Sequence, residues 1–219
     1  MLLINWTPAF AGVTKWFSRY PSRRNIIRNL TTKFLTAIFL LGASSAAFAH
    51  PGHNVSGLAA GLMHPLSGLD HLLAMLAVGL WAAQGGGRKV WLLPATFMTM
   101  LVIGASAAMQ WQSLPLVEAG IATSVLALGL LIALSLQFPV ALSVAVTALF
   151  GLMHGYAHGL ELPESAAPSA YALGFLAATA TLHLTGITVG ILTRNHFAFL
   201  SKLLGIAIAA SGAWMLATG

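Results

Sequence analysis

Cysteine is absent from this 219-residue chain, and charged residues are scarce. Without cysteine, the protein cannot form disulfides, bind iron–sulfur clusters or hold a metal through thiolates. Asp, Glu, Lys and Arg make up 6% of the sequence, whereas charged residues account for about 25% of a soluble domain. Because 58% of the residues are hydrophobic, the composition is that of a membrane protein rather than an ordinary soluble domain.

Basic residues are concentrated near the N-terminus, where six of the ten precede residue 34, at Lys15, Arg19, Arg23, Arg24, Arg28 and Lys33. The rest of the chain is nearly neutral, so the net charge of +6 does not indicate nucleic-acid binding. Residues 34–49 form a short apolar segment that ends in Ala47-Phe48-Ala49. This pattern predicts a basic extension over 1–33 and a signal peptide cleaved after Ala49, with an uncleaved anchor as the alternative.

The remaining chain contains about six apolar runs that are long enough to cross a bilayer. Gly- and Pro-containing breaks separate them, and the predicted spans cover 64–84, 90–109, 117–136, 139–158, 169–192 and 197–217. Residues 50–63 are too short to span and form the predicted periplasmic segment. We therefore expect an all-α integral membrane protein, with a transmembrane helical domain over 64–219.

The few charges after residue 50 predict the orientation of this domain. Arg88 and Lys89 follow the first span, and Arg194 and Lys202 flank the junction of the last two spans. All four fall on one side of a six-span bundle, which the positive-inside rule assigns to the cytoplasm. A cleaved signal would leave the mature N-terminus in the periplasm, so we expect a multi-pass protein of the bacterial inner membrane.

Ionisable residues form a first cluster, His64-Pro-Leu-Ser-Gly-Leu-Asp70-His71, at the outer start of the first span. An ionisable group at the bilayer centre costs about 2.5–3.5 kcal/mol, so such residues indicate function. Pro65 suits the first position of a helix, which predicts that His64 lies at the helix cap. Asp70 and His71 are adjacent and point about 100° apart, so one is expected to bind an ion and the other to support it.

A second cluster, His154, His158 and Glu161, lies at the outer end of the fourth span. The spacing i, i+4 and i+7 places the three side chains on one face of a helix. Because the topology brings both clusters to the same side of the membrane, we expect them to form one site. Imidazole nitrogens and carboxylate oxygens suit a borderline divalent metal ion. The alternative is a helix end that reaches the polar headgroups, where His and Glu cost little.

Two further histidines are candidate metal ligands. His183 lies deep in the fifth predicted span, either hydrogen-bonded to a neighbouring Ser or Thr or acting as a second station on a path through the bundle. His50 would become the mature N-terminus, where its imidazole and the free α-amine could capture a metal ion. The alternative is that His50 is at the mature N-terminus only because the signal peptide ends there, and that it has no role in metal binding.

The first cluster, followed by Leu-Leu-Ala-Met-Leu-Ala-Val-Gly-Leu-Trp-Ala-Ala, resembles the signature of the HupE/UreJ family. These small bacterial membrane proteins are associated with hydrogenase and urease gene clusters and are regarded as nickel permeases. The resemblance implies a secondary transporter that supplies nickel for hydrogenase or urease maturation. It also implies that the protein lies in the lipid bilayer and has hydrogenase or urease maturation proteins as further partners. It also implies that the functional residues are His64, Asp70, His71, His154 and Glu161.

Other functions remain open at this point. A metal sensor or delivery protein would use the same ligands without transport, and a haem protein would pair His residues across two helices. A metalloprotease would need His-Glu-x-x-His, but Gly155 stands where the general base would be. The chain has no nucleotide-binding motif. We therefore predict a protein that is not an enzyme and has no tightly bound cofactor, with nickel as its cargo and cobalt or zinc as alternatives.

Overall fold

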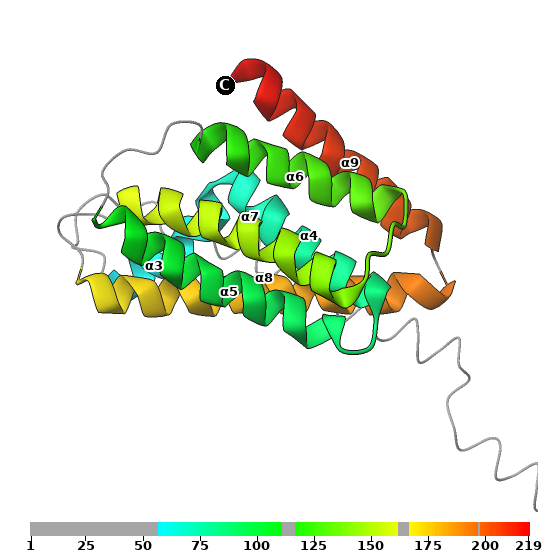
Figure 1. Cartoon of the computed structure of the whole chain (residues 1–219), viewed down its shortest axis with the longest axis horizontal. Coiled ribbons are helices and arrows are strands. Elements are labelled where there is room, and N and C mark those ends of the chain that lie inside the picture. The colour runs from blue at the N-terminus through cyan, green and yellow to red at the C-terminus, as the bar shows by residue number, and fades with distance from the viewer. Residues whose placement is uncertain (1–56, 111–116, 162–166, 197) are drawn as a thin grey trace, which may run out of the picture. The chain divides into compact units, whose positions relative to one another are not determined.

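The computed structural model describes residues 57–110, 117–161, 167–196 and 198–219. Every regular element within these ranges is a helix (Figure 1), which confirms the predicted all-α class. The helices are α3 (Gly57–Ser67), α4 (Leu69–Gly85), α5 (Lys89–Ala108), α6 (Val117–Ala133), α7 (Val140–Leu160), α8 (Pro168–His196) and α9 (Ala198–Thr218). The predicted signal peptide, its cleavage after Ala49, and His50 lie outside the described residues.

Four of these helices, α5, α7, α8 and α9, are long and apolar enough to cross a membrane. A fifth crossing is formed if α3 and α4 are taken together as one broken span. Helix α6 is apolar but has 17 residues, so at 1.5 Å per residue it is about 25 Å long, close to the shortest length that spans. The chain is therefore a multi-pass membrane protein, and the count of six spans stays a prediction.

The first predicted span is bent, because α3 and α4 meet at an angle of 82°. The break is at Gly68, whose backbone is extended (φ −95°, ψ 121°). A Cβ atom at Gly68 would lie 2.8 Å from Oδ1 of Asp70 and 3.0 Å from Nδ1 of His71. Gly68 therefore leaves room for these two side chains where the helix turns.

The expectation that a helix begins at Pro65, with His64 as its cap, is wrong. Both residues lie inside α3, which begins at Gly57. The helix extends further towards the N-terminus because α3 packs against α8, where a side chain at Gly61 would collide with the Tyr171 carbonyl. Pro65 removes one backbone donor from the second half of α3, close to the point where that helix ends.

Glycines bring the helices together in pairs. A side chain at Gly155 of α7 would collide with the Leu101 carbonyl of α5, and one at Gly79 of α4 with the His183 carbonyl of α8. Helices α6 and α9, which lie side by side in Figure 1, approach in the same way at Gly129. Such close backbone contacts are the usual means of association between helices in lipid. They fix the relative heights of the side chains on each pair.

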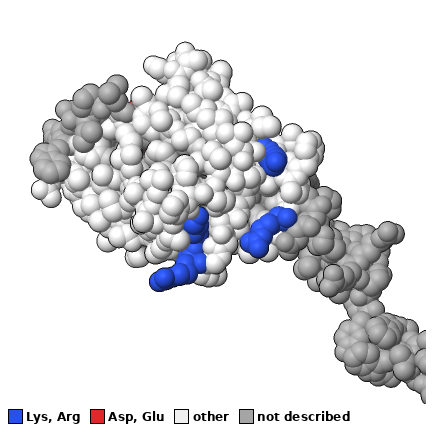
Figure 2. Space-filling model, turned by 45° about the vertical axis from the view of Figure 1, so that its right-hand side comes forward, with Lys and Arg blue, Asp and Glu red and all other residues white. Residues whose placement is uncertain are grey.

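The two ends of the bundle differ in charge. His71 is near the start of α4, whereas Arg88 and Lys89 follow the end of that helix. Arg194 lies in the last turn of α8, and Lys202 in the first turns of α9. Figure 2 shows these Lys and Arg side chains gathered towards one end of the molecule. The histidines of α3 and α4 therefore lie at the end opposite to the basic residues.

Candidate metal site

Side chains from α3 and from the end of α7 converge on one carboxylate. Nε2 of His64 lies 3.0 Å from Oε2 of Glu161, and Nδ1 of His158 lies 3.6 Å from the same oxygen. One ligand atom from each of these three residues lies within 4.8 Å of the other two. His158 is buried, whereas the side chain of Glu161 is 46% exposed. The three residues could hold a metal ion at the surface of the bundle.

The imidazole of His71 is held by the neighbouring carboxylate. Nδ1 of His71 is 2.6 Å from Oδ1 of Asp70, which also accepts a hydrogen bond from the backbone N–H of His71 at 2.8 Å. A carboxylate can only accept, so Nδ1 carries the proton and Nε2 presents a lone pair. The pair explains how two adjacent residues that point in different directions can act on one site. It also matches the arrangement in which a carboxylate orients a metal-binding histidine.

Four imidazoles form a continuous cluster that runs inwards from Glu161. Ring centroids are separated by 4.9 Å between His64 and His158, 4.1 Å between His158 and His71, and 5.4 Å between His71 and His154. The last of these rings, His154, is completely buried. The four residues come from α3, α4 and α7, so helix packing unites the two clusters found in the sequence.

Several ring nitrogens in this cluster are buried without a hydrogen-bond partner among the described residues. They are Nε2 of His71, Nε2 of His154 and Nε2 of His158, whereas Nδ1 of His158 has only the Glu161 carboxylate near it, at 3.6 Å. Nδ1 of His154 donates to the carbonyl of Phe150 at 2.9 Å, which leaves its Nε2 as the acceptor. Buried polar atoms are nearly always paired, so a group of unpaired lone pairs calls for an explanation. An ion that binds to several imidazoles would satisfy them.

The carboxylate at the surface stays charged over a wide pH range. Glu161 follows the last residue of α7 and is half-exposed. The nearby His158 and His64 rings hold the pKa of Glu161 well below its usual range, although partial burial opposes the shift. Glu161 is therefore ionised at neutral and mildly acidic pH, and its negative charge lies at the outer edge of the imidazole cluster.

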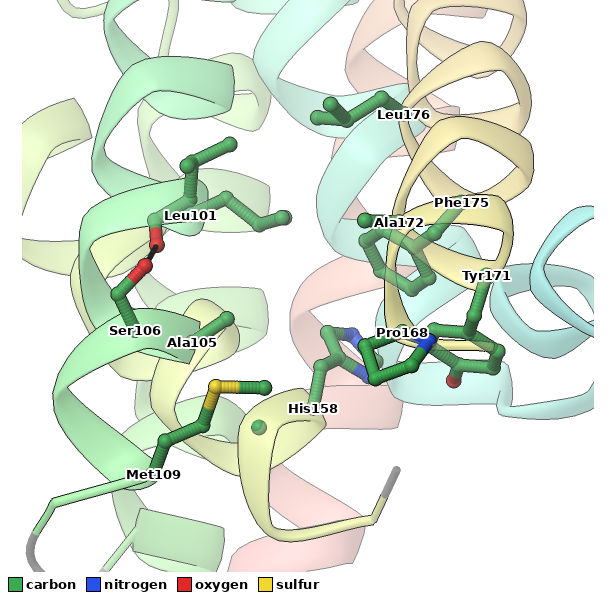
Figure 3. A pocket seen from close by; sticks show the side chains of 12 residues that line it. Leu101, Ala105, Ser106, Met109, His158, Pro168, Tyr171, Ala172, Phe175 and Leu176 are labelled. Carbon is green, nitrogen blue, oxygen red and sulfur yellow. Dashed lines mark hydrogen bonds between the residues drawn. The ribbon is translucent and has the colours of Figure 1, made fainter. Parts of the chain in front are cut away.

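Aromatic side chains of α8 form one wall of the cluster. The ring of Phe175 lies 4.1 Å from that of His158, and the ring of Tyr171 lies 5.7 Å from that of His64. These aromatic rings line a cavity of about 130 Å³. Figure 3 shows them facing Leu101 of α5 and Met109, which follows that helix, with His158 at the edge. The cavity is lined mainly by apolar side chains, so it does not offer a route for a hydrated cation. Glu161, by contrast, has its carboxylate exposed at the surface.

The structure brings together six of the eight candidate ligands, His64, Asp70, His71, His154, His158 and Glu161. His183 lies apart from them in the middle of α8, with its ring 5.2 Å from that of Phe97. Sequence reasoning missed the aromatic neighbours of the cluster, which are Phe97, Tyr171 and Phe175. In helices that are apolar on every side, no sequence signal distinguishes these rings from ordinary core aromatics.

Comparison with known proteins identifies the family of this chain. The family model described as HupE / UreJ protein matches residues 38–215. The chain belongs to the HupE/UreJ family. It is 40% identical over 186 residues to a protein named "Protein HupE" from Rhizobium leguminosarum bv. viciae, a match that covers 84% of this chain and 97% of that protein. No solved structure matches the chain.

Proposed function

We propose that this protein is a secondary transporter that moves a divalent transition-metal ion, with nickel as its first substrate, across the bacterial inner membrane. The observation that carries the proposal is the cluster of four contacting imidazoles and one exposed carboxylate at one end of a membrane bundle. Ionisable side chains inside a membrane protein are costly and typically mark the path of an ion. The nickel would supply hydrogenase or urease maturation proteins.

Each member of the cluster has a distinct role in this proposal. Glu161 attracts the cation and, with His64 and His158, forms the first binding position. Asp70 holds the ring of His71 so that its Nε2 faces the ion, and His154 receives the ion next. Imidazoles with carboxylates favour nickel, cobalt or zinc over magnesium. Membership of the HupE/UreJ family, rather than ligand chemistry, favours nickel over cobalt and zinc.

The charge distribution supports inward movement of the ion. The histidine end of the bundle faces the periplasm if the basic end, with Arg88 and Arg194, faces the cytoplasm as the positive-inside rule requires. A cleaved signal peptide over 34–49 and a periplasmic mature N-terminus at His50 fit this orientation. The membrane potential would then favour cation uptake by about 2.3 kcal/mol per charge per 100 mV.

Two alternatives have specific weaknesses. A haem would need open space for its porphyrin between two axial ligands, but the rings of His71 and Phe175 both lie 4.1 Å from that of His158. A sensor or delivery protein would use the same ligands, but it would not need polar groups in the middle of the bundle. The buried His183 in the centre of α8 favours transport over delivery.

The test is nickel uptake by sealed vesicles that contain only this purified protein. We expect uptake driven by an inside-negative potential, and a strong reduction in the Asp70→Asn variant at limiting nickel. Asn keeps the size of Asp and an acceptor for His71 but removes the charge. Thr188→Val, which changes an exposed hydroxyl bonded to its own helix, serves as the matched control. Binding without flux would support the delivery function, and normal uptake by Asp70→Asn would contradict the site.

A further inference from the structure

His183 is a buried histidine that the outer cluster does not use. It is 1% exposed, and neither ring nitrogen has a hydrogen-bond partner among the described residues. Its ring packs against Phe97 at 5.2 Å, and the other neighbour of Phe97 is His154 at 5.4 Å. One aromatic ring of α5 therefore separates the innermost imidazole of the outer cluster from a further imidazole that has no partner.

The depth of His183 differs from that of the outer cluster. His183 is 15 residues beyond the start of α8 at Pro168, which corresponds to about 22 Å along the helix axis. His154 is six residues from the end of α7 at Leu160, or about 9 Å. Because α7 ends and α8 begins at the same end of the bundle, His183 lies near the centre of the membrane.

Two threonine hydroxyl groups at a depth similar to that of His183 are also buried without a hydrogen-bond partner among the described residues. Thr179 and Thr147 are both fully buried, and neither Oγ1 has a hydrogen-bond partner among the described residues. Thr179 is four residues before His183 on the same face of α8. Thr147 is 13 residues from the end of α7, at a depth of about 20 Å.

The other threonines of α8 show that these unpaired hydroxyls are exceptional. Thr181, Thr185, Thr188 and Thr193 each donate to the carbonyl four residues earlier at 2.8 Å. This local bond is available to any threonine in a helix, yet Thr179 does not form it. The hydroxyl that shares a helix face with His183 therefore lacks the bond that the other threonines of α8 form, and it is free to serve a ligand.

We propose that His183 is a second, membrane-central station for a divalent transition-metal ion, with the hydroxyl of Thr179 and retained water completing the ligands. This inference rests on the proposed transport function and adds to it an inner site beyond Phe97. One imidazole with neutral oxygens binds more weakly than the outer cluster. Such weakness suits an intermediate position, because conduction requires an ion to leave each site as well as bind it.

Because the native chain has no cysteine, a single cysteine at position 183 gives a direct spectroscopic test. Purified His183→Cys in lipid nanodiscs is titrated with Co²⁺, whose thiolate complex absorbs through sulfur-to-cobalt charge transfer. We expect this absorption in His183→Cys and not in the matched control Leu184→Cys, whose side chain is 51% exposed on the outside of the bundle. Absence of the band in His183→Cys, or an equal band in both variants, would overturn the inner station.

A transport measurement separates this inference from the proposed function. In sealed vesicles, His183→Leu should lower Ni²⁺ uptake by about tenfold or more, while calorimetry of the same protein shows unchanged Ni²⁺ affinity at the outer cluster. Leu184→Ala is the control and should transport normally. If His183→Leu transports as well as the unaltered protein, the inner station is wrong. If the unaltered protein moves no Ni²⁺, the transport function fails, whereas a Co²⁺ band at position 183 would still establish that a metal reaches the inner site.

Discussion

Nε2 of His64 lies 3.0 Å from Oε2 of Glu161, although 97 positions separate the two residues in the chain. The contact joins α3 to the end of α7 and closes the outer side of the imidazole cluster. The contact depends on the bend at Gly68. Because α3 and α4 meet at 82°, His64 on α3 reaches Glu161 at the end of the bundle, while His71 remains on α4. The two histidines of the first motif thus approach His158 from different helices.

Glu161→Gln should weaken nickel binding by about tenfold or more, because it removes the charged member of the outer group while keeping its size. Isothermal titration of purified protein with Ni²⁺ measures the change. Thr123→Val is the control, because its exposed hydroxyl donates to the Ala119 carbonyl of its own helix α6. An unchanged affinity in Glu161→Gln would exclude this carboxylate from the site.

Gly155→Val should destabilise the protein by about 1–3 kcal/mol, the usual effect of overpacking. The new side chain would collide with the Leu101 carbonyl of α5 and displace α7, together with His154 and His158. Thermal unfolding in detergent measures the loss, and Ala213→Val on the exposed side of α9 should leave the melting temperature unchanged. Equal melting curves for the two variants would show that the contact between α5 and α7 tolerates a side chain.

Much of the outer site could be predicted from the sequence, because ionisable residues are rare in this chain and span topology brings them to one end. The bend at Gly68 could not, since it depends on how α3 packs against α8 at Gly61. The aromatic wall was also missed. Hydrophobic periodicity identifies the buried side of a helix only when its other side is polar, and α8 is apolar on both sides.

The number of spans predicts where the C-terminus lies. If α6 crosses the membrane and the mature N-terminus is periplasmic, six spans place Gly219 in the periplasm, on the same side as Glu161. An epitope tag fused after Gly219 should therefore be reached by antibody in spheroplasts without permeabilisation. A tag detected only after permeabilisation would reduce the count by one, with the 17-residue α6 as the helix that fails to cross.

Nickel binding should weaken as the external pH falls, because imidazole binds a metal only when it is neutral. The unperturbed imidazole pKa is about 6.5, and burial disfavours the charged ring, so the loss should be greatest at the acid end of the range from about pH 7.5 to 5.5. Glu161 does not contribute to this loss, because the His158 and His64 rings keep its pKa low and the carboxylate remains charged throughout the range. The acid sensitivity therefore does not come from Glu161. Magnesium, which prefers oxygen ligands and holds its water tightly, should compete poorly even in large excess.

The measurement for this last prediction is nickel uptake in vesicles over that pH range, with and without excess Mg²⁺. Glu161→Gln provides the internal comparison. Its uptake should be lower at every pH but should still decline as the pH falls, because the four imidazoles remain. If uptake resists acid, or if Mg²⁺ inhibits as strongly as Co²⁺, oxygen ligands rather than histidines hold the ion. The proposed roles of His64, His71, His154 and His158 would then be wrong.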